Sequence, residues 1–243
     1  MNDLKVLRWT GAFGVAAGVL LLVASPLYVV PGTPPSLGDE ALFSEYVIRS
    51  NTIHLTTKLV DVVYLVGFMV FAAGLRYLIR RMRPDYEWLA ALVFGSALVA
   101  TANILIFEAL AGGAALDTFT RPDPIVVRAL TEAALASQAF GFILTALFLA
   151  AASYAILATR ALPRWTGWLG IGVAVLNLAA VPAIFGGNDF MEAVIAGVTT
   201  TAGLYVYINV VQGVAYVGWL LIVGISVMRV KREAVAPTPV YGG

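Results

Sequence analysis

Three ionisable side chains, His54, Lys58 and Asp61, lie within one apolar stretch of the sequence. Their spacing of i, i+4 and i+7 places all three on one face of a helix. Inside a membrane an ionisable side chain costs about 2.5–3.5 kcal/mol on insertion scales, and it marks a candidate functional site. We therefore expect the three side chains to face the interior of a helix bundle and not lipid.

Polar side chains in other stretches extend this cluster into a candidate ligand-binding site. The further members are Asn103, Glu108, Arg128, Glu132, Gln138, Asn209 and Gln212. Together the side chains could surround a small molecule or ion, or Asp61, Glu108 or Glu132 could act as acid–base groups. A structural explanation stays open beside both, because opposite charges at helical spacing neutralise each other and amides often join helices.

Missing residue types narrow the chemistry. Without cysteine, the chain has no thiolate nucleophile, disulfide, iron–sulfur cluster or thiolate zinc site. Its single histidine, His54, excludes three-histidine metal sites. We expect no metal, no cofactor and no enzymatic activity, with an integral membrane enzyme that uses carboxylates of the outer pocket as the alternative.

The composition defines the environment of these groups. Of the 243 residues, 60% are hydrophobic and 12% charged, whereas soluble domains have roughly 25% charged residues. A soluble chain of this size could not hide so much apolar surface, and a disordered chain needs low hydrophobicity. The net charge of +1 argues against a nucleic-acid partner. The sequence therefore predicts an all-α, multi-pass membrane protein.

Six apolar stretches are long enough to cross a bilayer core, which needs about 20 helical residues. They are residues 9–30, 54–79, 88–111, 133–158, 165–186 and 204–228. The first could instead be a cleaved signal peptide, but it is too long and ends without a convincing cleavage site. We predict one transmembrane domain over residues 1–232 and a flexible cytoplasmic tail over residues 233–243.

Basic residues predict the orientation, because they favour the cytoplasmic side. Eleven of the 15 fall on one side of the predicted spans. They are Lys5, Arg8, Arg76, Arg80, Arg81, Arg83, Arg160, Arg164, Arg229, Lys231 and Arg232. Both termini should therefore be cytoplasmic, and the polar cluster should lie mainly in the outer third of the bilayer or just above it.

Two segments are predicted to be helical on the outer side. Residues 36–50 carry apolar side chains at helical spacing, which predicts an amphipathic helix lying on the outer surface. Asp123 supplies an N-cap with Pro124 at the first helical position. The fourth helix should therefore begin outside the membrane, from about residue 124, and continue to Thr159.

The most specific pattern is an internal match. The tetrad RWTG occurs at residues 8–11 and 164–167, and ten of the 19 positions aligned by this shift of 156 are identical. A weaker match pairs residues 66–68 with 217–219. Helices one–two and five–six are thus predicted to be copies of one hairpin, related by an axis along the membrane normal. Anchoring of Arg and Trp at the interface would also explain the tetrads.

Two features carry a resemblance to a known group: residues 162–170, which read LPRWTGWLG, and the helix over residues 51–81 that leads into a basic turn. With its six spans, the chain resembles actinobacterial multi-pass membrane proteins related to domain of unknown function 4386. The resemblance covers most of residues 4–230 and implies the bacterial cytoplasmic (inner) membrane. That family has no established activity, so nothing about a substrate is implied.

Two non-enzymatic roles fit these patterns. The protein either binds or transports a small molecule or lipid through an outward-facing polar pocket, or is an accessory subunit of a membrane complex. Polar groups on several helices and the duplicated hairpin favour the first role, whereas the apolar inner halves of the spans disfavour a deep charged pathway. Expected partners are membrane lipid, a small-molecule ligand and other membrane subunits or a second copy of the chain.

Overall fold

The computed structural model describes residues 3–28, 30–31, 35, 38–119, 123–182 and 201–230, with the backbone only at residues 28 and 201–207. Every regular element in these ranges is helical, which confirms the all-α prediction for this part of the chain. The α-helices are α1 (Asp3–Ala24), α2 (Glu40–Met82), α3 (Glu87–Asp117), α4 (Pro124–Thr159), α5 (Arg164–Ala180) and α7 (Thr201–Met228), with 3-10 turns η1 (Ser25–Tyr28) and η2 (Pro84–Tyr86). The predicted tail and the end of the span over residues 165–186 lie outside the described residues.

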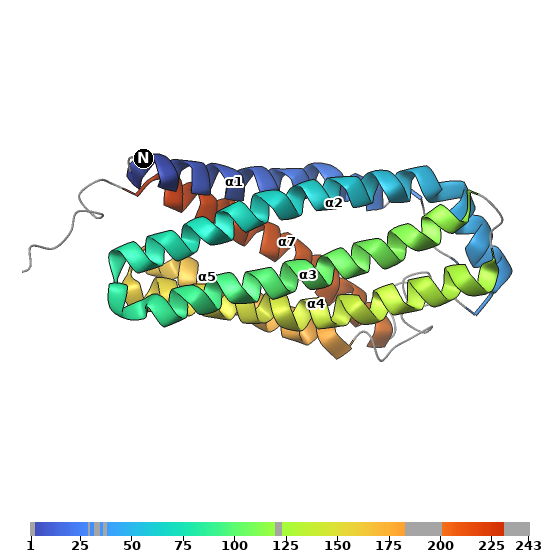
Figure 1. Cartoon of the computed structure of the whole chain (residues 1–243). Helices are drawn as coiled ribbons and strands as arrows, with labels where there is room; N and C mark the ends of the chain where they lie inside the picture. The colour runs from blue at the N-terminus through green and yellow to red at the C-terminus, as the bar shows by residue number, and fades with distance from the viewer. Residues whose placement is uncertain are drawn as a thin grey trace, which may run out of the picture.

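The helices lie side by side in an elongated bundle and alternate in direction along the chain (Figure 1). We call the end where α1, α3 and α5 begin the basic end, because Lys5, Arg8, Arg80, Arg83 and Arg164 lie there, and the opposite end the far end. Five segments within the described residues are long and apolar enough to cross a membrane. They are Asp3–Leu27, Glu40–Met82, Pro84–Asp117, Pro124–Thr159 and Ile208–Met228. This architecture is that of a helical membrane protein.

α2 includes the segment that was expected to lie on the outer surface. The sequence predicts a separate helix over residues 36–50; instead, α2 begins after the Asp39 N-cap and runs unbroken for 43 residues. No proline or glycine interrupts it before Gly67, so its backbone hydrogen-bond ladder continues. Its first turns pack against α3 and α4 in a small apolar cluster. The cluster consists of Phe43, Tyr46, Val47, Ala114, Ala115 and Val127.

α4 begins and ends where the sequence predicts. The Asp123 side chain accepts a hydrogen bond from the Ile125 backbone N–H at 2.9 Å, and Pro124 occupies the first turn. The helix runs for 36 residues to Thr159, which is about 54 Å at 1.5 Å per residue. Arg160 ends it in the left-handed conformation, with φ at 54°.

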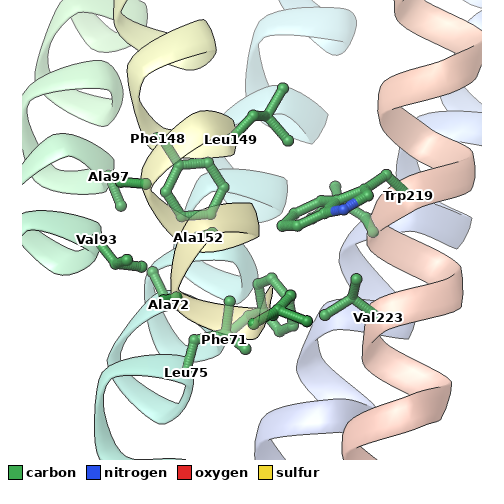
Figure 2. Close-up of a cluster of buried hydrophobic side chains, with 14 of the residues drawn as sticks. Phe71, Ala72, Leu75, Val93, Ala97, Phe148, Leu149, Ala152, Trp219 and Val223 are labelled. Atoms are coloured by element: carbon green, nitrogen blue, oxygen red, sulfur yellow. The ribbon is translucent and has the colours of Figure 1, made fainter. Parts of the chain in front are cut away.

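A close-packed aromatic core fills the half of the bundle toward the basic end. Its members Phe68, Phe71, Phe148 and Trp219 are each 0–2% exposed. Phe148 meets Phe68 and Trp219 edge-on, with ring centroids 5.1 and 5.9 Å apart, the geometry that aromatic pairs favour. Figure 2 shows Phe71, Phe148 and Trp219 pointing toward one another from α2, α4 and α7. This layer closes the bundle interior toward the basic end.

Small residues let α1 approach its neighbours closely. A Cβ atom on Gly11 would overlap the backbone of Gly224 in α7. The spacing of Gly14 and Gly18 fits either dimerisation or contact within one chain. In the structure both glycines pack on side chains of α2 and α7 of the same chain, so this pattern serves intramolecular packing.

The two RWTG tetrads share a pattern of exposure. Trp9 and Trp165 are 59% and 55% exposed, and each is followed by a buried threonine. Gly14 and Gly170, each three residues beyond its tetrad, both pack against an aromatic ring, in α2 and α7 respectively. Exposed tryptophan near the basic end also suits an interfacial anchor. The duplicated hairpin stays a prediction.

Candidate ligand-binding site

Two neighbouring cavities lie between the aromatic core and the far end, and Phe107 and Gln138 line both of them. The inner cavity, of about 210 Å³, is lined among others by Asp61, Tyr64, Glu108, Thr145, Asn177 and Tyr216. The outer cavity, of about 460 Å³, is lined among others by Tyr46, His54, Lys58, Ala111, Thr131 and Leu135. Side chains of α2, α3 and α4 line both cavities, and α5 and α7 add to the inner one.

Lys58 of α2 and Glu108 of α3 form an ion pair at the boundary between the cavities. Lys58 Nζ lies 2.9 Å from Glu108 Oε2 and 4.7 Å from the centroid of the Phe107 ring. Lys58 lines the outer cavity, whereas Glu108 lines the inner one. The two side chains are 15% and 7% exposed, so their attraction acts largely away from bulk water, where it is stronger.

Asp61 adds a second buried carboxylate to the inner cavity. It is 5% exposed, and its side chain interacts with that of Glu108. Lys58 lies three residues earlier on the same face of α2. As the spacing predicts, these side chains face the bundle interior and meet a partner from another helix.

Hydroxyl and amide groups join the helices around the inner cavity. The hydroxyls of Tyr64 in α2 and Tyr216 in α7 are 2.6 Å apart. Gln212 Nε2 of α7 donates to Asn177 Oδ1 of α5 at 3.0 Å. Asn103 Nδ2 of α3 donates to a backbone carbonyl of α4 at 2.8 Å. These bonds hold the walls of the cavity in place on five helices.

His54 faces the outer cavity and takes no part in the ion pair. Its ring lies edge-on to Tyr46, with centroids 5.9 Å apart. Among the residues that the structure describes, no group accepts from or donates to the buried Nε2 atom. His54 therefore leaves one hydrogen-bonding position for a molecule in the outer cavity.

Three predicted site residues lie elsewhere. Arg128 bonds to Glu132 and to Glu40 of α2 near the far end, both at 2.8 Å. This small network joins the protruding turns of α4 to the start of α2. Asn209 on α7 lines neither cavity. Sequence spacing could not separate these residues from the cluster, because that separation depends on how far α4 and α7 extend past their neighbours.

Other lining residues were missing from the predicted set. They are Tyr64, Phe107, Phe142, Thr145, Asn177 and Tyr216. Tyr64 carried a usable signal, because it continues the i, i+4, i+7 face of His54, Lys58 and Asp61. Asn177 did too, as an isolated amide in an apolar span. The two phenylalanines had none, because aromatic side chains occur throughout the apolar stretches.

The lining of the inner cavity defines what it can do chemically. It offers carboxylates, phenol and amide groups between aromatic rings, with an ammonium group at its border, and such a mixture suits a small molecule that carries charge or hydrogen-bonding groups. Within the described residues, no group of three or more His, Cys, Asp or Glu side chains could hold a metal ion.

The fold and these cavities together define a class: a helical membrane protein with a polar centre inside its bundle. Comparisons with family models, with curated proteins and with solved structures find no match to this chain. The function therefore has to be argued from the geometry of the site.

Proposed function

We propose that this chain is a six-span protein of the bacterial inner membrane, with both termini in the cytoplasm, and that its inner cavity binds a small molecule from the outside. The concentration of Lys and Arg at the basic end supports the orientation. α5, with 17 residues between Arg164 and Ala180, would be the sixth span together with the apolar residues that follow. The resemblance to relatives of domain of unknown function 4386 agrees with this location and adds no substrate.

The depth of the site supports outward access. Asp61 precedes Arg76 of the basic end by 15 residues on α2, about 22 Å at 1.5 Å per residue. In a hydrocarbon core of about 30 Å, Asp61 then lies in the outer third. The outer cavity continues from there toward the far end, whereas the aromatic core closes the opposite direction.

One observation carries the proposal: the buried charges face open volume. A purely structural ion pair would be surrounded by packed side chains, because leaving space beside it forfeits dispersion energy and hydrogen bonds. Here Glu108 and Asp61 line a cavity of about 210 Å³. The role as an accessory subunit does not account for this cavity, and the enzyme alternative has less support because Lys58 engages Glu108.

Cysteine accessibility tests the proposal, because the chain has no cysteine of its own and every engineered thiol is unique. Ala111→Cys and Thr145→Cys place a thiol in the outer and inner cavities. We expect both to react with a membrane-impermeant thiol reagent added outside intact cells. Ala72→Cys, in the fully buried core of the same bundle, is the matched control and should stay unlabelled.

Labelling from the cytoplasmic side only, in inside-out vesicles, would overturn the outward orientation. Absence of labelling at both cavity positions from either side would overturn the cavity as a water-accessible site. A denatured sample, in which all three thiols must react, shows that each variant is expressed and chemically competent.

A further inference from the structure

The charges that line the two cavities are unequal in number. Among the described lining residues, two are acidic, Asp61 and Glu108, and one is a permanently basic group, Lys58. In a site away from bulk water, an uncompensated carboxylate favours a bound cation. An anionic ligand would add to the like charge and is disfavoured by the same argument.

The structure also shows which kind of cation the site accepts. The ammonium group of Lys58 sits 2.9 Å from a Glu108 oxygen and 4.7 Å from the centre of the Phe107 ring. This is the pairing of carboxylate and aromatic face that holds ammonium ligands. Tyr64, Phe142 and Tyr216 provide further aromatic surface in the inner cavity.

Lys58 is not locked at this position. Its ammonium sits on a flexible four-carbon stem, and the side chain lines the larger outer cavity, of about 460 Å³. An ammonium group in the inner cavity could therefore take its place at Glu108 while Lys58 moves outward into open volume. The inner cavity, of about 210 Å³, exceeds the cavity of about 150 Å³ that holds benzene in another protein.

Resting on the proposed function, we propose that the inner cavity binds small organic amines as cations, and that Lys58 is a built-in competitor which the ligand displaces from Glu108. The ligand's ammonium pairs with the two carboxylates, and its apolar body packs between the aromatic rings. Access runs through the outer cavity. No covalent step is involved.

Three probes of one shape test the charge preference: benzylamine, benzyl alcohol and benzoate. Titration calorimetry on the purified full chain in detergent at neutral pH should give benzylamine at least about tenfold tighter binding than benzyl alcohol, and benzoate the weakest binding. Glu108→Gln should remove this preference for the amine but retain benzyl alcohol binding. Asp61→Asn is the second variant, should Glu108→Gln fail to fold.

Lys58 variants test the competition, with opposite expected signs. Lys58→Met removes the competitor and should tighten benzylamine binding by about tenfold, as expected for loss of a tethered group with a high effective concentration. Lys58→Arg should weaken it, because a guanidinium holds a carboxylate through two hydrogen bonds. Unchanged or reversed affinities would overturn the role of Lys58.

The outcomes separate this inference from the proposed function. Equal affinity for the three probes, or a preference for benzoate, overturns the amine ligand; the cavity function survives if Thr145→Phe, which fills the inner cavity, still abolishes binding. Leu147→Phe, at a 45% exposed position of the same helix, is the control and should bind normally. If no probe binds, or Thr145→Phe changes nothing, the proposed binding cavity itself is overturned.

Discussion

The two halves of this bundle are built from the same helices, yet one is filled and the other is hollow. Toward the basic end, aromatic rings and small residues interlock, with Phe71, Phe148 and Trp219 almost completely buried. Toward the far end, the same helices separate around two cavities and are joined by an ion pair and by hydrogen bonds of polar side chains.

The difference shows how a membrane protein can divide stability from binding. Lipid tails are as apolar as a helix surface, so close packing and interhelical hydrogen bonds hold such a bundle together. The filled half provides the packing. The hollow half gives up part of it and places charges at the vacated volume, an arrangement that suits binding and not rigidity.

The largest effect concerns which half faces outside, because the expected readout is all or none. Reporter fusions after Arg83, Gly113, Arg164 and Gly243 should report inside, outside, inside and inside, as the basic residues predict. An external C-terminus would reverse the assignment and place the hollow half toward the cytoplasm.

Breaking the filled half should cost most of the stability. We expect Phe148→Ala to lower the free energy of unfolding in detergent by about 3 kcal/mol, because it leaves a void that its packed neighbours cannot close. Phe140→Ala, at a 60% exposed position of the same helix, is the control and should change thermal unfolding much less. Equal effects would show that the filled half contributes no special packing.

Close approach of α1 and α7 gives a smaller effect within the filled half. Gly224→Ala should destabilise the protein by about 1–3 kcal/mol, since its Cβ would overlap atoms of α1. Gly218→Ala on the same helix meets nothing within 4 Å and should be neutral or slightly stabilising, because alanine is the better helix former. Thermal unfolding of the two variants measures the contrast, and a loss at Gly218 would contradict it.

The smallest effect on stability is expected in the hollow half. Asp61→Asn leaves the ion pair of Lys58 and Glu108 in place, so the free energy of unfolding without ligand should change by less than about 1 kcal/mol. The same substitution should abolish the rise in melting temperature with benzylamine, because a ligand stabilises only the state it binds. A large loss of stability without any ligand effect would mean that the cluster is structural.

Much of the local structure could be predicted from the sequence. The cap at Asp123, the inward face of Lys58 and Asp61 and the helical spans all follow from short-range spacing, which depends on neighbouring residues alone. The separate surface helix over residues 36–50 was wrong for a related reason: the apolar spacing was detected correctly, but its partners, Ala114 and Val127 among them, are contributed by helices far along the chain.

The candidate site itself was predicted only in part. Its charged members were found because charge in an apolar span is rare, whereas Phe107 and Tyr216 became lining residues through the way the helices cross. Arg128 shows the converse, because its charge drew attention although the length of α4 carries it to a different network at the far end.

By itself, the sequence determined that long helices form, that their basic residues gather at one end, and which side chains α2 turns inward, because each depends on composition or on the period of the helix. Only the tertiary structure decided that Lys58 pairs with Glu108 across two helices and that the space beside the pair stays open. Those outcomes depend on the register and crossing of helices that lie far apart in the chain, and no local pattern encodes them.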